Sequence, residues 1–279
     1  MNAKSRYDHL SSYRANFLDT AVQCSELTIP YLVTRDEYTR MSFKNLKQPW
    51  QSVGSKAVVT LAAKLMLALL PPQTTFFKLQ IRDDKLGTEM PAEMRSELDL
   101  SFAKIERMVM DSIAASSDRV VVHQAIKHLV VSGNALIYMG KDGLKHYPLN
   151  RYVVERDGNG NVIEIVTKEI INKQLLPKEV QLKDHESVVD KSYGGENECE
   201  VYTHVRLDNN RWLWYQEVYG KKIPGSEGKA PKDASPWLVL RFNSVDGENY
   251  GRGRVEEFLG DLKSLDALSQ ALVEGSAAA

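Results

Sequence analysis

The stretch PWLVLRFNSVDGENYGRGRVEEFLGDLKSLDALSQALVEGSAAA, residues 236–279, decides the fold predicted for this chain. It opens with a strand at Trp237–Phe242, turns at Asp246–Gly247 and enters a long helix at Arg252. A helix from Arg252 to Glu274 is about 35 Å long, at about 1.5 Å per residue. Apolar residues recur in it every three or four positions and form one stripe. The stripe comprises Val255, Phe258, Leu259, Leu262, Leu265, Leu268 and Leu272.

No later segment of the sequence covers this stripe, which leaves three arrangements open. The helix folds back on earlier residues, it packs against another chain, or the sequence is the front part of a longer protein. The other faces of the helix are charged, and residues 252–275 include three basic and five acidic side chains. A helix that grips DNA has the opposite balance. The sequence therefore predicts an apolar contact with protein.

The N-terminal half has the 3.6-residue periodicity of helices. The apolar run Ala57–Leu70 predicts a buried helix, which Pro71–Pro72 ends. After it, bulky and polar residues alternate at Phe76–Ile81, and this pattern predicts a strand. The expected helices are residues 5–26, residues 53–70 with Ser52 as N-cap, residues 91–115 with Pro91 in the first turn, and a helix capped by Asp118 that ends at Gly133–Asn134.

The period changes from 3.6 to 2 between Ala135 and Phe242, which predicts a strand-rich middle. Two hairpins are expected, one across Asp157–Asn161 and one across Asp208–Asn210. The polar segment Leu182–Glu198 is expected to be a loop. The expected strands are residues 135–139, 152–156, 162–171, 201–207 and 211–218. A helical N-terminal half, a strand-rich middle and one long C-terminal helix indicate an α+β fold.

The composition is that of an ordinary globular protein with enough length for a substantial core. Of the 279 residues, 43% are hydrophobic and 26% are charged. Thirty-six basic and 37 acidic residues leave a net charge of −1, which argues against a general nucleic-acid binder. The two cysteines lie far apart and indicate a reducing compartment. The N-terminus lacks the apolar segment of a signal peptide, and no apolar run is long enough to cross a bilayer.

Three motifs have a functional and a structural interpretation. Asp157–Asn161 resembles the start of a calcium loop, but the twelfth position is Lys168 instead of glutamate, so a hairpin turn is favoured. Gly251 and Gly253 follow a strand and precede a helix, as in a nucleotide loop. The third glycine and the lysine of such loops are missing, and we favour a flexible corner that aims the helix over an anion site. Aromatic residues of the strand 211–218 are expected to be buried instead of stacking on nucleic acid.

The sequence contains no catalytic signature. His123 and His128 are five residues apart on a predicted helix and do not share a face, so they do not form a metal pair. There is no Gly-x-Ser-x-Gly motif, and neither cysteine has surroundings that favour a reactive thiolate. We therefore predict no catalytic residue, no metal ligand, no cofactor-binding residue and no enzyme activity.

Several stretches resemble the portal (head-to-tail connector) proteins of short-tailed bacteriophages. They occur in the order found in that family and cover most of the chain between about residues 5 and 275. Each stretch is weak alone, and together they are specific. They are Gln48–Gly54 with Leu61–Pro71, His128–Leu136, Tyr152–Val162, and Asp246–Arg252 continuing through Leu259–Leu262.

This resemblance implies a ring of twelve subunits at one capsid vertex of the virion, assembled in the host cytoplasm. Residues 1–250 then correspond to the wing, an α+β domain, and residues 251–279 to the first stem helix. The clip, the second stem helix and the crown of the family are absent from this sequence. The implied partners are double-stranded DNA in the channel, the terminase, tail adaptor proteins and the major capsid protein, with no membrane.

The resemblance also assigns roles to the last helix. Its apolar stripe, Val255 to Leu272 as given above, is expected at the interface between subunits. The charged residues on the other faces are candidates to face the channel, where an acidic wall repels phosphate and lets DNA travel. These candidates are Glu257, Asp261, Lys263 and Asp266.

Two other classes of function compete with this interpretation. The first is a small-molecule hydrolase with a site in the strand-rich middle, which requires a concave pocket on which titrating groups converge. The second is a peripheral membrane adapter that uses the terminal helix. That helix lacks the basic flank expected for binding anionic lipid, so this alternative ranks last.

Overall fold

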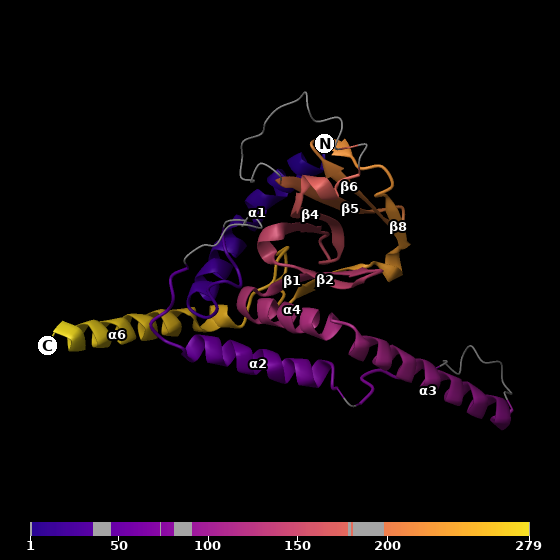
Figure 1. Cartoon of the computed structure of the whole chain (residues 1–279), viewed down its shortest axis with the longest axis horizontal. Helices are drawn as coiled ribbons and strands as arrows, with labels where there is room; N and C mark the ends of the chain where they lie inside the picture. The colour runs from indigo at the N-terminus through magenta and orange to yellow at the C-terminus, as the bar shows by residue number, and fades with distance from the viewer. Residues whose placement is uncertain are drawn as a thin grey trace.

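A computed structural model describes residues 2–35, 46–72, 74–80, 91–177, 180 and 198–278 of the chain (Figure 1). It has the α+β architecture predicted from the sequence, with helices first, strands in the middle and a long helix last. Among the described residues, no helix is both long and apolar enough to cross a membrane. The predicted loop at Leu182–Glu198 lies outside the described residues except for its last position, Glu198, which begins a strand.

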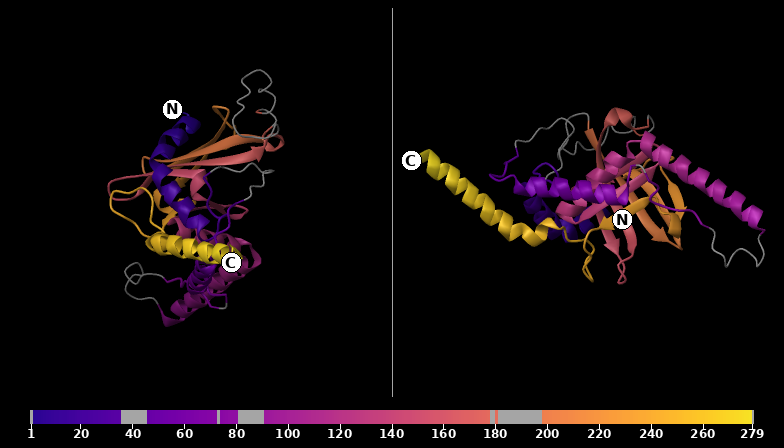
Figure 2. Two further views of the ribbon diagram at one scale, coloured as in Figure 1. Left: turned by 90° about the vertical axis from the view of Figure 1, so that its left-hand side faces the viewer. Right: turned by 90° about the horizontal axis from the view of Figure 1, so that it is seen from below.

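α2 and α4 lie beneath the strands, α1 runs up along their side, and α3 and α6 project from the body (Figure 1). α4 packs against α2 and α1, and it also contacts strands β1 and β2. α3 and α6 project from opposite sides of the body (Figure 2). The helices are α1 (Ala3–Glu26), α2 (Val53–Leu69), α3 (Ala92–Ala115), α4 (Asp118–Ser132) and α6 (Leu259–Ala278), with short 3-10 turns η1 (Leu149–Arg151), η2 (Lys173–Leu175), η3 (Lys232–Ala234) and η4 (Val255–Phe258).

The strands form two antiparallel sheets. In the first, β1 pairs with β2 on one side and β9 on the other, so that Leu136 faces both Tyr147 and Val239. The second has the order β3-β4-β5-β6-β7, and β8 also pairs with β6. The strands are β1 (Asn134–Gly140), β2 (Gly143–Tyr147), β3 (Tyr152–Arg156), β4 (Val162–Asn172), β5 (Glu198–Asp208), β6 (Arg211–Val218), β7 (Lys221–Lys222), β8 (Gly228–Pro231) and β9 (Trp237–Arg241).

The main core joins residues that are far apart in the sequence. Val130 of α4, Leu136 of β1 and Val154 of β3 are buried in it together with Tyr250 and Val255. A second cluster packs Tyr7 and Leu10 of α1 against Val153, Val166 and Tyr202 of the second sheet. The start of the last helix therefore belongs to the main core, and a domain boundary at residue 250 stays a prediction.

Two local predictions were wrong, the strand at 76–81 and the cap at Asp118. No strand forms at 76–80, because this segment pairs with no other described strand and an isolated strand leaves its backbone groups unbonded. Ser52 is the N-cap residue of α2 as predicted, but its side chain makes no capping bond, and Gln51 Oε1 accepts from Gly54 N at 2.9 Å. Asp118 begins α4 instead of capping it, and its Oδ1 accepts from Leu144 N at 2.8 Å.

The prediction that the apolar helix α2 is buried was also wrong. Only Gly54, Val58 and Ala62 are buried, on the side that packs against α4. The opposite side is exposed, including Val53 and Leu67. A run that is apolar all round indicates burial, but it does not indicate whether the cover comes from the same chain.

A cluster of charged residues fastens α1 to the second sheet. Arg6 Nε and Nη2 donate to Glu164 Oε2 at 2.9 and 2.6 Å, and Arg6 also pairs with Glu155. His204 Nε2 lies 2.5 Å from Glu164 Oε1. Burial by itself raises the pKa of Glu164, but the hydrogen bonds from His204 and Arg6 outweigh it and lower this pKa to about 2. Glu164 therefore stays ionised at all but strongly acidic pH.

Two histidines whose rings are in contact are expected to make the fold sensitive to mild acid. His128 and His146 have ring centroids 4.3 Å apart. Burial lowers the pKa of His146 to about 4 and that of His128 well below its ordinary value. In the unfolded chain, histidine has a pKa of about 6.5. Between this pKa and the pKa of about 4 for folded His146, the unfolded chain therefore binds more protons than the folded chain. Stability is therefore present above pH 6.5 and is lost as pH falls toward 4, by on the order of 3 kcal/mol from His146.

Urea unfolding at pH 7.5, 6, 5 and 4.5 measures this loss. We expect His146→Phe to make the decline less steep, because it removes one of the two buried histidines that must stay neutral. His9→Phe, at an exposed position of α1, is the matched control and is expected to keep the wild-type slope. A wild-type stability that is level between pH 7 and 4.5 contradicts this prediction. Glu164 does not contribute to this decline, since its lowered pKa changes stability only between its ordinary pKa and about 2.

Candidate functional site

The root of the C-terminal helix is the candidate site, and three closely packed glycines build it. Gly133 ends α4 with a φ of 74°, a conformation that glycine adopts without strain. A Cβ atom there would lie 2.4 Å from the carbonyl carbon of Arg252. One on Gly253 would lie 2.5 Å from the carbonyl oxygen of Val131. Because such contacts are too short for any side chain, glycines let the two segments touch backbone to backbone.

Asn134 locks this contact with its side-chain amide. Its Nδ2 donates to the carbonyl oxygen of Gly251 at 2.8 Å, and its Oδ1 accepts from Gly251 N at 2.7 Å. The residue is only 1% exposed. Asn243 and Arg252 add a pair of backbone hydrogen bonds, at 3.2 and 2.8 Å. The corner aims the helix as predicted, but it is held by hydrogen bonds on both sides instead of being flexible.

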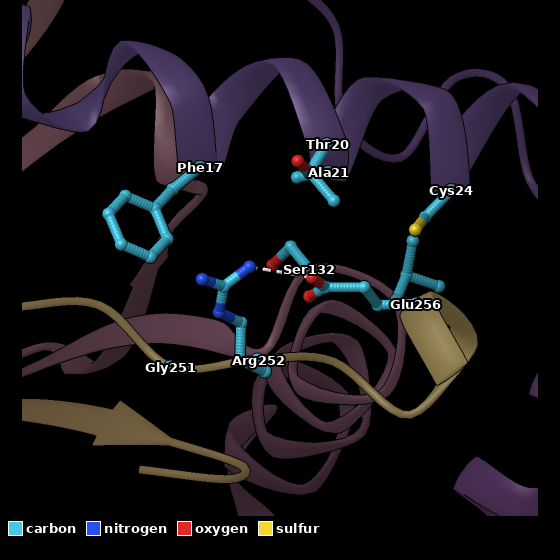
Figure 3. A pocket seen from close by; sticks show the side chains of 9 residues that line it. Phe17, Thr20, Ala21, Cys24, Ser132, Gly251, Arg252 and Glu256 are labelled. Carbon is cyan, nitrogen blue, oxygen red and sulfur yellow. Dashed lines mark hydrogen bonds and ion pairs between the residues drawn. The ribbon is translucent and has the colours of Figure 1, made fainter. Parts of the chain in front are cut away.

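Arg252 is held by carboxylates of its own segment. Its Nε and Nη2 donate to Glu248 at 3.0 and 2.6 Å. Its Nη1 donates to Glu256 at 2.7 Å (Figure 3). The hydrogen bonds that it donates to Glu248 and then to Glu256 raise its pKa, and the guanidinium lies over the Phe17 ring at 5.2 Å. Because Arg254 likewise pairs with Glu257, both arginines beside the glycines have carboxylate partners. This arrangement gives no support to an anion site here.

The space between α1 and this root is too small for a ligand. Phe17, Cys24, Ser132, Arg252 and Glu256 surround a cavity of about 10 Å³ (Figure 3). That volume holds roughly one water molecule. Burial, and then the charge of Glu256, raise the pKa of the Cys24 thiol to about 12. The thiol therefore stays protonated and has the character of a packed apolar group.

The apolar stripe of the last helix divides into two faces. Val255 is buried, and Leu259 and Leu262 are half-buried against the main core; these three residues are the inner face. The other four residues are the outer stripe, and they point away from the core. Their exposed fractions are 46% for Phe258, 36% for Leu265, 64% for Leu268 and 71% for Leu272.

The four charged residues predicted to face the channel also fall into two groups. Lys263 Nζ donates to Gln23 Oε1 of α1 at 2.8 Å, and Asp266 Oδ1 accepts from Trp50 N at 2.7 Å. Glu257 pairs with Arg254, while Asp261 is exposed in the outer stripe. Lys263 and Asp266 thus contact their own chain. The sequence reasoning missed Gln23, Trp50, Glu248 and the amide of Asn134 at this root. Glu248 alone had a local signal, because it lies four residues before Arg252.

The other motifs have structural roles. Asp157 closes the predicted hairpin turn, with its Oδ1 accepting from the backbone nitrogens of Asn159 and Asn161 at 2.9 and 2.7 Å. Trp212 is buried, and Gly228 lies against the Trp214 ring, so these aromatics pack inside as predicted. Within the described parts of the chain, no group of three or more histidine, cysteine, aspartate or glutamate side chains is arranged to hold a metal.

A pocket of about 530 Å³ opens beside β2 and β4, in the strand-rich middle where the hydrolase alternative places its site. Its carboxylate, Glu169, accepts from Lys145 Nζ at 2.7 Å and pairs with the Tyr147 hydroxyl. Burial raises the pKa of that hydroxyl, so it does not ionise at neutral pH. None of the described residues that line the pocket is a serine or cysteine. The pocket gives the hydrolase alternative no nucleophile of these types.

Comparison with known proteins agrees with the sequence resemblance. The family model "Bacteriophage head to tail connecting protein" matches residues 1–279. The chain is 37% identical over 287 residues to the portal protein of Escherichia phage T7 and 38% identical over 286 residues to that of Enterobacteria phage T3. Each alignment covers 98% of this chain and 52% of the relative, so the chain spans about half the length of these relatives.

The portal protein of Pseudomonas phage phiKMV is 30% identical over 264 residues, which cover 90% of this chain and 50% of that relative. These matches run through both sheets and the root of the last helix. They give no support to a hydrolase. The chain belongs to the family of bacteriophage head-to-tail connecting proteins.

Proposed function

We propose that this chain acts in a portal: a structural ring at one capsid vertex of the virion that joins head to tail. The observation that carries the proposal is the outer stripe of α6. Phe258, Leu265, Leu268 and Leu272 are exposed on a helix that leaves the body, while the inner face of the same helix is anchored in the core. Contiguous exposed apolar residues mark interaction surfaces.

In the proposed ring, the outer stripe contacts a neighbouring copy. A ring requires heterologous contacts, in which one face of a subunit meets a different face of the next subunit and the rotation closes. The rigid corner at Gly133, Asn134 and Gly251 supports this role, because a closed ring needs each helix to leave its subunit at the same angle. We propose twelve subunits, as the family resemblance implies.

The channel of this ring would carry double-stranded DNA during packaging and ejection. The last helix has an acidic excess, with Asp261, Asp266 and Glu274 against Lys263. Acidic side chains repel phosphate, which suits a polymer that must move past the wall. Glu257 is the exposed acidic candidate for that wall, because Lys263 and Asp266 contact their own chain and Asp261 lies in the outer stripe.

We propose a conduit without enzyme activity of its own. Energy for packaging would come from a partner ATPase, the terminase, which docks on the ring before the tail adaptor proteins do. The major capsid protein would surround the ring at the vertex, and assembly would take place in the host cytoplasm.

Particle mass tests this proposal. The complete encoded protein, measured by mass photometry from nanomolar to micromolar concentration, is expected to form one closed species whose mass is twelve times that of the subunit. Electron micrographs of that species are expected to show a ring with a central hole. A protein that stays monomeric at the highest concentration overturns the proposal, and a closed ring of another size corrects only the subunit number.

A further inference from the structure

Helix α2 has an exposed groove on the side opposite to its buried face. The groove, of about 430 Å³, is lined by Val53, Lys56, Ala57, Thr60, Leu61 and Lys64; we call it the α2 groove. Its apolar floor is made by valine, alanine and leucine side chains, with a lysine toward each end. Exposed apolar floors rimmed by polar groups are typical of protein-binding surfaces.

The α2 groove is basic and its lysines are available. Lys56 and Lys64 are both exposed, and α2 contains no acidic residue. Among the described residues, no ion pair involves either lysine. A partner for this groove therefore needs apolar side chains along its centre and acidic side chains beside them.

The outer stripe of α6 has this chemistry. Asp261 lies in the stripe between Phe258 and Leu265, and Glu257 is exposed next to it. α6 carries three acidic residues and one basic residue, whereas α2 carries two basic residues and none acidic. The lengths also match, because helices of 20 and 17 residues are about 30 and 25 Å long.

The two surfaces do not cover each other within one copy. Trp50, just before α2, bonds to Asp266 of α6, and from there the two helices extend in opposite directions (Figure 1). The outer stripe and the α2 groove both remain exposed as a result. A second copy is the occupant that offers each surface its complement.

We propose that the outer stripe of α6 in one copy docks in the α2 groove of the next copy. This contact rests on the proposed portal ring and names its two faces. It joins two different surfaces of the same chain, so it is heterologous and repeats around a ring. The lysines at the two ends of the groove set the position of the helix through Asp261, and the leucines supply the buried apolar area.

Charge reversal tests the contact in the complete encoded protein. Lys56→Glu with Lys64→Glu is expected to raise the concentration for half-assembly at least tenfold, because the attraction of both lysines to Asp261 becomes repulsion. Adding Asp261→Lys to this variant is expected to recover part of the loss. Lys221→Glu with Lys229→Glu makes the same charge change on β7 and β8 and is expected to assemble like wild type.

A cross-link provides a second measurement. A chain with Thr60→Cys and Leu268→Cys, treated with a bismaleimide, is expected to give a ladder of dimers and higher multiples. Native Cys24 and Cys199 are buried and do not compete. Thr60→Cys with Leu175→Cys is the control and is expected to give no ladder.

The outcomes separate the two proposals. Rings that form normally in the charge-reversed chain, or that give no Thr60–Leu268 ladder, overturn this contact and leave the portal function standing. A wild-type chain that forms no ring overturns the portal function and this contact together. A cross-link that forms only within one chain also overturns the contact.

Discussion

A chain with Leu265→Ala, Leu268→Ala and Leu272→Ala is expected to remain folded and to lose assembly. The three leucines are exposed in the single copy, so their truncation changes its unfolding free energy little. Alanine also has the higher helix propensity. In the proposed ring they become buried, and each full burial is worth about 1.5–3 kcal/mol. Together they contribute about 5 kcal/mol or more per contact, which is more than a thousandfold in association.

Particle mass and urea unfolding, measured on the same samples, check this prediction. A matched control replaces three exposed apolar residues elsewhere, Val120, Met139 and Leu175, by alanine and is expected to keep the ring. Intact rings in the triple leucine variant remove the outer stripe from the interface. A variant that loses its fold instead shows that these side chains pack within the subunit.

Gly133→Val is expected to cost about 3–5 kcal/mol, the largest loss of stability among single substitutions at this root. A Cβ at this position meets the backbone of Arg252 and Gly253 at 2.4 and 2.5 Å, and a β-branched residue is strained at a φ of 74°. The backbone of residues 251–253 must move away to make room. The inner face of the last helix then loses its fixed position against the core.

Urea unfolding measures the cost, and limited proteolysis between residues 243 and 255 reports the released corner. Gly260→Ala is the control within the last helix, where a Cβ meets no atom within 4 Å; it is expected to stabilise by about 1 kcal/mol. If Gly133→Val does not fold, Asn134→Asp tests the same corner without a steric clash. It keeps the acceptor for Gly251 N and loses the bond to the Gly251 carbonyl oxygen. Wild-type stability and protease resistance in both variants contradict the locked corner.

The local sequence pattern predicted most of the helices and strands, because apolar residues recur with a different spacing in each. The strand at Tyr152–Arg156 and the strand at Arg211–Val218 occur at the predicted positions, and Gly133 ends its helix as expected. The strand predicted at Phe76–Ile81 failed over its described residues. Alternation shows that a segment suits a sheet, but it does not supply the neighbouring strand that must accept its hydrogen bonds.

The sequence predicted the site as a flexible glycine corner followed by a helix with one apolar stripe. Nothing local distinguishes Leu262, which faces the core, from Leu265, three positions further along and more exposed. The contacts of Asn134 with Gly251 and of Trp50 with Asp266 join segments more than a hundred residues apart. Such pairs have no spacing signature in the sequence.

The sequence by itself determined the order of helices and strands, the amphipathic last helix, its acidic bias and the family resemblance. Only the tertiary structure decided that the glycine corner is locked, that the stripe divides into an inner face and an outer stripe, and that α2 is exposed on one side. The physical reason is that periodicity is a property of neighbouring residues. Burial depends on which distant surface packs against a segment and excludes water from it. That surface can belong to the same chain or to another copy.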